Sequence, residues 1–143
     1  MQILDQLKPL GLLLLRFALG VIFIFHGYPK LFSSTQQMMG FFTHVGLPAY
    51  FVFVAGVFEF FGGILLIIGL FTRLAALLLA AEMLVALWKV HGLFTHPAAV
   101  DNYQFPLSLC AAAFALATVG AGVISLDHIL FRGARKAARK SRD

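Results

Sequence analysis

The sequence predicts an all-α, polytopic membrane protein built as a bundle of four transmembrane helices. Three observations favour this fold class: the composition, the length of the apolar segments and the placement of the basic residues. Of the 143 residues, 61% are hydrophobic and 12% are charged, whereas soluble domains carry about 45–50% apolar and about 25% charged residues. Strands are not expected, because alternation with period 2 is absent and only helices or closed barrels satisfy the backbone in lipid.

Four apolar segments have the length of transmembrane helices. A bilayer core about 30 Å thick requires about 20 mostly apolar residues in a helix. The segments cover approximately residues 10–27, 49–71, 74–90 and 105–126. Tyr28-Pro29 is expected to end the first helix, because proline disfavours helical backbone at the residue before it.

The connections indicate how the helices follow one another. Phe71-Thr72-Arg73 is a very short connection, so the second and third helices are expected to form an antiparallel hairpin. Thr95-His96-Pro97 marks a looser loop. Pro106 is expected in the first turn of the fourth helix, where proline is well tolerated.

Basic residues determine the expected orientation. The last segment of the chain carries Arg132, Arg135, Lys136, Arg139, Lys140 and Arg142. Because cytoplasmic ends of transmembrane helices are enriched in Lys and Arg, we expect one transmembrane domain over residues 1–131 and a basic cytoplasmic tail over residues 132–143. Four crossings then place both termini in the cytoplasm.

The partner implied by this arrangement is the lipid bilayer. A basic segment beside the membrane is attracted to anionic headgroups by about 1 kcal/mol per residue near the surface. The basic tail accounts for the sequence pI of about 9.8, and nucleic-acid binding is not expected.

Ionisable residues occur in the middle of three apolar segments: Arg16, Glu59 and Glu82. A charge at this depth costs at least about 2.5 kcal/mol on insertion scales. The three side chains are therefore expected to face one another inside the bundle. Lys89 lies on the same helix face as Glu82, and the four charges sum to zero.

Glycines accompany the charges on the first two helices. The five are Gly20, Gly27, Gly56, Gly62 and Gly63. The first two continue the stripe of Arg16, and the other three flank Glu59. Small residues let helices approach closely in lipid, so these glycines are expected to pack the helices around the charged cluster.

A second polar group is expected towards the outer face, where histidines could hydrogen-bond a quinone carbonyl or exchange protons. The complete set of expected ligand-binding residues is Arg16, His26, Lys30, Glu59, Glu82, Lys89 and His91. The alternative interpretation is structural, with an Arg–Glu network that locks the helices together and interfacial side chains that reach the headgroups. No catalytic residue is assigned on either interpretation.

No cofactor can be assigned from the residues alone. Cys110 is the single cysteine, which excludes an intramolecular disulfide and a dithiol site. Metal-binding histidine spacings, an Fe–S cysteine set and a nucleotide-binding glycine fingerprint are also absent from the sequence. Any electron transfer therefore requires an external carrier or a partner protein.

The order of several motifs resembles the DoxX family. Its opening signature, R-x3-G-x2-F-x2-H-G-x2-K, is matched by Arg16, Gly20, Phe23, His26, Gly27 and Lys30. Later matches, in order, are Gly46-Leu-Pro48, Glu59 with Gly62-Gly63, Gly69-Leu-Phe-Thr-Arg73, Glu82, Gly120-Ala-Gly122 and Ser125-Leu-Asp127. The resemblance covers nearly the whole chain.

This resemblance implies a small four-helix protein of the bacterial inner membrane. It is similar to the DoxD subunit associated with thiosulfate:quinone oxidoreductase, which implies quinone as a bound substrate and redox proteins as partners. Members of the family often carry an acidic residue where this chain has Gln104, which argues against a proton-carrying role at that position.

Three functions are compatible with these residues. A redox-associated subunit would bind quinone or a similar lipid-soluble molecule in an intramembrane polar pocket. A non-catalytic scaffold or assembly factor would hold redox or stress-response partners. A small proton-linked transporter would use Glu59 and Glu82, with a homo-oligomer forming its pathway.

Overall fold

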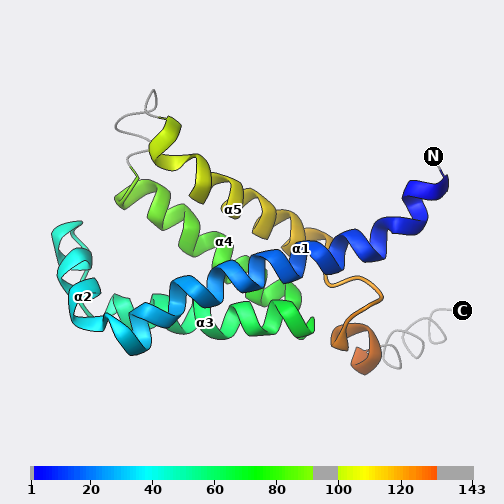
Figure 1. Cartoon of the computed structure of the whole chain (residues 1–143), viewed down its shortest axis with the longest axis horizontal. Helices are drawn as coiled ribbons and strands as arrows, with labels where there is room; N and C mark the ends of the chain where they lie inside the picture. Colours follow the sequence, from blue (N-terminus) through cyan, green and yellow to red (C-terminus); the bar gives the residue numbers. More distant parts are fainter. Residues whose placement is uncertain (1, 92–99, 132–143) are drawn as a thin grey trace, which may run out of the picture.

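The structure is a computed structural model that describes residues 2–91 and 100–131. Its elements in chain order are α1 (Gln2–Tyr28), the π-helix η1 (Pro29–Ser33), α2 (Thr35–His44), α3 (Phe51–Ile68), α4 (Thr72–Lys89) and α5 (Val100–Val119). Every regular element in these residues is helical, which confirms the predicted all-α class. The long helices α1, α3, α4 and α5 run alongside one another, and α2 lies across one end of them (Figure 1).

Two helical stretches are long and apolar enough to cross a membrane by length and composition. They are Asp5–Ser33 and Phe51–Ile68, with mean hydropathies of 2.1 and 2.5. Within the most apolar 18-residue part of each stretch, the share buried inside the protein is only 28% for the first and 33% for the second. An apolar helix that the protein leaves mostly uncovered requires an apolar surrounding, which a bilayer supplies.

The α-helix α1 ends at Tyr28, where the sequence predicts the end of the first helix. The chain nevertheless stays helical beyond this point, because the π-helix η1 follows from Pro29 to Ser33. The Ser34 N–H donates to the Pro29 carbonyl oxygen at 2.9 Å, which is the i→i+5 pattern of a π-helix. Proline is tolerated here because it opens a new turn, where its missing N–H is not needed. α2 follows in a stretch for which no helix was predicted.

The fourth helix lies earlier in the chain than predicted. α5 covers Val100–Val119 instead of residues 105–126, so Pro106 falls inside the helix rather than in its first turn. Gly120 ends the helix with φ of +91°, in the left-handed region that favours glycine. The sequence stays apolar after Gly120, so the predicted segment extends to residue 126. The helix itself does not continue past Val119.

The predicted hairpin of the second and third helices is confirmed. Gly69 takes φ of +72° at the end of α3, and α4 begins at Thr72. The Leu70 N–H bonds to the Leu65 carbonyl oxygen at 3.0 Å, and the Gly69 N–H bonds to the Leu66 carbonyl oxygen at 3.2 Å. Helices commonly end on a glycine with this pair of hydrogen bonds.

α1 and α3 are antiparallel and meet through their backbones at two glycine pairs. A Cβ at Gly63 would lie 2.6 Å from the Gly20 carbonyl oxygen, and a Cβ at Gly20 would lie 2.6 Å from the Gly63 carbonyl oxygen. Nearer to η1, a Cβ at Gly27 would lie 2.9 Å from the Gly56 carbonyl oxygen. The two pairs fix the register of the helices, because side chains larger than hydrogen have no room there.

Arg16 joins three parts of the chain at the end of the bundle opposite α2. Its side chain is buried, with 1% exposure. Nε and Nη2 donate to the carbonyls of Leu66 and Ile67 at 3.0 and 3.3 Å, and Nη1 donates to the carbonyls of Ala121 and Ile124 at 2.5 and 2.7 Å. The guanidinium thus satisfies carbonyls that the end of α3 and the segment after α5 leave open.

Asp127 caps α4 from the far end of the described chain. Oδ1 and Oδ2 accept hydrogen bonds from the Phe71 and Thr72 N–H groups at 2.7 and 2.9 Å. The Asp127 N–H donates to the Gly69 carbonyl oxygen at 2.9 Å. A carboxylate at this position satisfies open N–H groups and complements the positive end of the helix dipole.

Gly63→Ala is expected to lower the free energy of unfolding by about 1–3 kcal/mol, because the added Cβ forces α1 and α3 apart. Gly11→Ala is the matched control, since Gly11 is also helical and a Cβ there would meet nothing within 4 Å. Unfolding of both purified variants by SDS in mixed micelles measures the difference. Equal stability of the two variants would contradict the backbone contact.

Asp127→Ala is expected to lower the free energy of unfolding by about 1 kcal/mol, the usual cost of losing a helix cap. Asp5→Ala is the control, because Asp5 forms an exposed ion pair with Lys8 and such pairs contribute about 0–1 kcal/mol. Hydrogen exchange of the Phe71 and Thr72 amides should accelerate in Asp127→Ala alone. Unchanged protection of these amides would rule out the cap.

Candidate functional site

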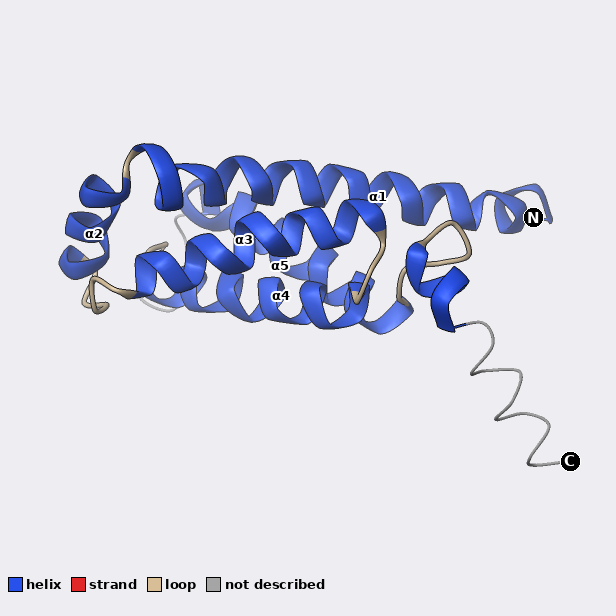
Figure 2. Cartoon of the chain, turned by 90° about the horizontal axis from the view of Figure 1, so that it is seen from below, coloured by secondary structure: helices blue, strands red, loops and turns tan. Residues whose placement is uncertain are grey.

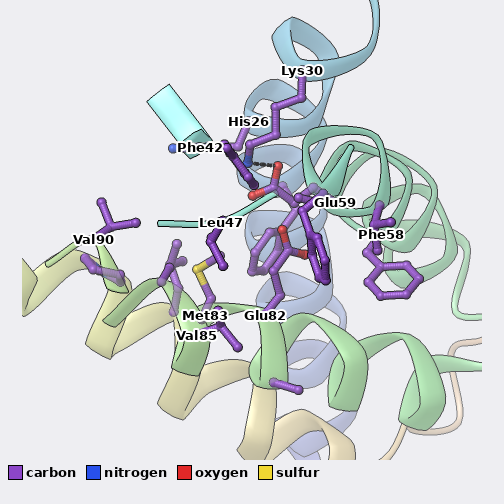
Figure 3. A pocket seen from close by; sticks show the side chains of 18 of the residues that line it. His26, Lys30, Phe42, Leu47, Phe58, Glu59, Glu82, Met83, Val85 and Val90 are labelled. Carbon is purple, nitrogen blue, oxygen red and sulfur yellow. Dashed lines mark hydrogen bonds and ion pairs between the residues drawn. The ribbon is translucent and has the colours of Figure 1, made fainter. Parts of the chain in front are cut away.

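A cavity of about 550 Å³ lies among α1, η1, α2, α3, α4 and the start of α5. Small-molecule sites typically measure about 300–1,000 Å³. The walls are mainly apolar, and aromatic rings come from Phe23, Phe41, Phe42, Phe51, Phe58 and Phe105. The polar side chains on the walls are His26, Lys30, Glu59, Glu82 and His91. Several of them are drawn in Figure 3, where they point into the same space.

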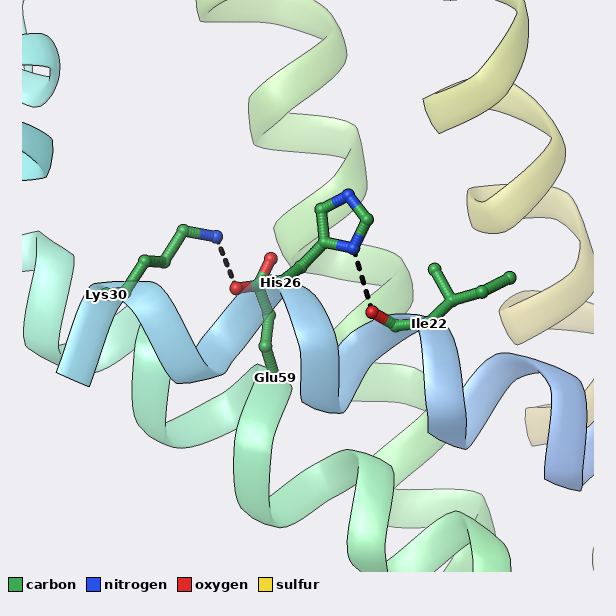
Figure 4. Close-up of polar contacts among 4 residues, drawn as sticks. All are labelled: Ile22, His26, Lys30 and Glu59. Atoms are coloured by element: carbon green, nitrogen blue, oxygen red, sulfur yellow. Dashed lines mark hydrogen bonds and ion pairs between the residues drawn. The ribbon is translucent and has the colours of Figure 1, made fainter. Parts of the chain in front are cut away.

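Glu59 and Lys30 form an ion pair on the cavity wall (Figure 4). Glu59 comes from the middle of α3 and is 1% exposed, whereas Lys30 comes from η1. Gly56 leaves room for the lysine, because a Cβ at Gly56 would lie 3.1 Å from the Lys30 Cβ. Pairing offsets the cost of placing two charges in an apolar environment.

Glu82 reaches the same cavity from α4. Its Oε2 atom is buried and has no hydrogen-bond partner among the residues that the structure describes. Figure 3 shows the side chains of Glu82 and Glu59 directed into the cavity from different helices. A buried polar atom without a partner costs about 1–3 kcal/mol, which a bound ligand can recover.

Two histidines border the cavity, and one ring nitrogen of each forms a hydrogen bond with a main-chain carbonyl oxygen. His26 Nδ1 lies 2.8 Å from the Ile22 carbonyl oxygen on α1 (Figure 4), and His91 Nδ1 lies 2.7 Å from the Asn102 carbonyl oxygen on α5. A carbonyl oxygen only accepts, so Nδ1 carries the proton in both rings and Nε2 of the neutral ring is an acceptor. Phe105 stacks on His26 with ring centroids 6.0 Å apart.

The structure places five of the seven predicted ligand-binding residues on the cavity walls, namely His26, Lys30, Glu59, Glu82 and His91. The first four come from α1, η1, α3 and α4, and His91 lies just after the end of α4. The two remaining predicted residues lie elsewhere.

The prediction that Arg16 faces Glu59 and Glu82 is wrong. Arg16 lies beside Leu66 and Ile67, about two helical turns, or ~11 Å, beyond Glu59 along α3. α1 is longer than α3 and projects past its end (Figure 2). The midpoints of the two apolar segments are therefore not level with each other, although their sequences suggested that they were.

Lys89 does not line the cavity, contrary to prediction. Its side chain is exposed, and Nζ lies 4.5 Å from the centroid of the Trp88 ring in a cation–π contact. Lys89 is the last residue of α4, and a long aliphatic stem at a helix end lets the ammonium reach the surface.

The predicted packing glycines lie at helix contacts. Gly20, Gly27, Gly56 and Gly63 lie where α1 and η1 meet α3. Gly62 faces α4 instead, where a Cβ would lie 3.3 Å from Leu79 Cδ1.

The α2 wall of the cavity was not predicted. It contributes Met38, Phe41 and Phe42, and Leu47 follows it. The i, i+3, i+4 spacing of the first three is the spacing of an amphipathic helix face. That pattern was the available signal, but the segment is too short and too polar to be selected as a transmembrane helix.

Comparison with known proteins identifies the family. The DoxX family model matches residues 11–92. A Bacillus subtilis (strain 168) protein named "Putative oxidoreductase CatD" is 32% identical over 124 residues, which cover 87% of this chain and 90% of that protein. The Escherichia coli (strain K12) inner membrane protein YqjF is 28% identical over 127 residues, covering 87% and 95%. No solved structure gives a significant match.

A second inner membrane protein of Escherichia coli (strain K12), YphA, is 34% identical over 131 residues, covering 85% of this chain and 91% of that protein. The aligned regions therefore extend over most of both chains. From the family model and these relatives, the chain belongs to the DoxX family of membrane proteins.

Proposed function

We propose that this protein is a redox-associated membrane subunit that binds a quinone-type, lipid-soluble molecule in the cavity between its helices. The observation that carries the proposal is the division of the cavity into apolar, aromatic walls and one cluster of ionisable side chains. Such a site suits a molecule with a flat ring, a few polar oxygen atoms and a long apolar tail.

The proposed membrane position uses four crossings. α1 and α3 have the required length and apolar character, and α4 and α5 run alongside them (Figure 1). The sequence after residue 131 is basic, and basic segments next to transmembrane helices are usually cytoplasmic. With four crossings, both termini are then assigned to the cytoplasm. That assignment places α2 and the cavity in the outer half of the bilayer. The basic tail lies outside the described residues.

The aromatic walls support a ring-shaped ligand. Offset or edge-to-face contacts between aromatic rings stabilise a complex by about 0.5–1.5 kcal/mol beyond the burial of their area. Phe42 lines the cavity from α2, Phe58 lines it from α3, and Phe105 lines it from α5. The polar head would then lie near the Lys30–Glu59 ion pair.

The proposal assigns binding to this chain and electron transfer to a partner. One cysteine in the whole sequence excludes an intramolecular dithiol centre. The name of the Bacillus subtilis relative, which describes an oxidoreductase, supports a redox setting. Redox proteins that dock on the membrane surface are the partners that such a role requires.

The binding proposal predicts that protein purified in lipid nanodiscs retains a lipid-soluble quinone in its oxidised or reduced form, detected by native mass spectrometry. Ala86→Phe should reduce this occupancy at least about tenfold, because overfilling a packed site costs about 1–3 kcal/mol. Ala86 lines the cavity one turn after Glu82. Ala115→Phe is the matched control on an exposed face of α5. Equal occupancy in the two variants would exclude the cavity as the site.

The orientation is tested by labelling single cysteines in spheroplasts of the variant Cys110→Ser, which has no other cysteine. Gln37→Cys on α2 should react with a membrane-impermeant maleimide added outside. Lys8→Cys should react only after the membrane is permeabilised. The reverse pattern would overturn the orientation, and reaction of both positions from outside would overturn the proposed crossings.

A further inference from the structure

We infer that the cavity selects ligands that donate hydrogen bonds, so that it favours a lipid-soluble phenol or hydroquinone over the corresponding quinone. This inference rests on the proposed function, since it specifies the chemistry of the molecule that occupies the same cavity. It follows from counting the donors and acceptors that the cavity walls present.

The histidines provide two acceptors. Each donates its Nδ1 proton to a main-chain carbonyl oxygen, of Ile22 for His26 and of Asn102 for His91. The remaining nitrogen of a neutral imidazole, Nε2, carries a lone pair and no proton. Figure 4 shows that Nε2 of His26 points away from α1, on the side opposite the bond to Ile22.

Glu82 provides a third acceptor. Its Oε2 atom is buried without a hydrogen-bond partner in the described part of the chain. The carboxylate form of this side chain only accepts hydrogen bonds, and the acid form accepts at one oxygen and donates from the other. Residues on the cavity walls therefore carry one acceptor on α1, one on α4 and one just after the end of α4.

The donors are fewer. Lys30 is the cationic side chain among the described cavity walls, and the remaining wall residues other than the histidines and the two glutamates are apolar. Its ammonium already donates to Glu59, which orients the group towards α3. A ligand that only accepts hydrogen bonds would find its donors on Lys30 and, when Glu82 is in its acid form, on the Glu82 hydroxyl.

The acceptor surplus matters more in a bilayer than in water. No solvent is present in the hydrocarbon region to donate to an open nitrogen or carboxyl oxygen, so a ligand hydroxyl that does so is favoured. A quinone carries two carbonyl acceptors and would leave the three wall acceptors open. Its hydroquinone carries two hydroxyl donors that can fill two of them.

The test compares two ligands that differ in one hydrogen-bond donor and do not undergo redox chemistry: 4-nonylphenol and its methyl ether, 4-nonylanisole. Each is equilibrated with the full-length protein in nanodiscs, and retention by empty nanodiscs is subtracted. The phenol is expected to bind at least about tenfold more tightly than the ether, as for sites built to hydrogen-bond a hydroxyl.

Glu82→Gln is the informative variant, because its amide has the size of the carboxyl group but also donates. The preference for the phenol should fall at least about threefold in this variant. Asp5→Asn makes the same chemical change at an exposed position at the start of α1 and should leave the preference unchanged. An unaltered preference in Glu82→Gln would overturn the assignment of Glu82 as an acceptor.

The outcomes for the unmodified protein separate the two proposals. Equal binding of the phenol and the ether would overturn the inference and leave the proposed binding function standing. Binding of neither ligand above the level of empty nanodiscs would overturn both. These ligand comparisons need no variant, so they remain decisive if Glu82→Gln fails to fold.

Discussion

The backbone contact between α1 and α3 is the constraint on which the rest of the molecule depends. In lipid, helices gain little from hiding apolar surface, so their association relies on close packing and on hydrogen bonds. Gly20 opposite Gly63 and Gly27 opposite Gly56 bring the two backbones together at two levels. This register decides which side chains meet. It places Lys30 over Glu59 at one end of the contact and Arg16 over the last carbonyls of α3 at the other.

The polar residues inside the bundle divide into two groups, according to whether their hydrogen bonds are all formed within the protein. Arg16 donates to four carbonyl oxygens and is enclosed by the segments that it joins. Glu82, in contrast, keeps a buried oxygen without a partner in the described residues. A side chain whose hydrogen bonds are complete serves the fold, whereas an incomplete one in a cavity is available to a ligand.

Sequence reasoning reached the helical class, the hairpin of α3 and α4 and the five polar residues of the cavity wall, because each depends on a local pattern. The position of Arg16 could not be predicted, because it depends on how far α1 projects past α3. The apolar segments do not indicate how one helix is shifted along the other. Sequence reasoning placed the end of α5 too late, because apolar composition continues beyond Gly120 although the backbone turns there. α2 was missed because its apolar face is only a few residues long.

The two ends of the Arg16 network lie 50 and 108 positions away along the chain, which has a consequence for biogenesis. A ribosome delivers α1 to the membrane long before it has made the segment that contains Ala121 and Ile124. Pairing of α1 with α3 can supply only the carbonyls of Leu66 and Ile67. A chain truncated before Ala121 would therefore leave two of the four hydrogen bonds of the buried Arg16 side chain unformed.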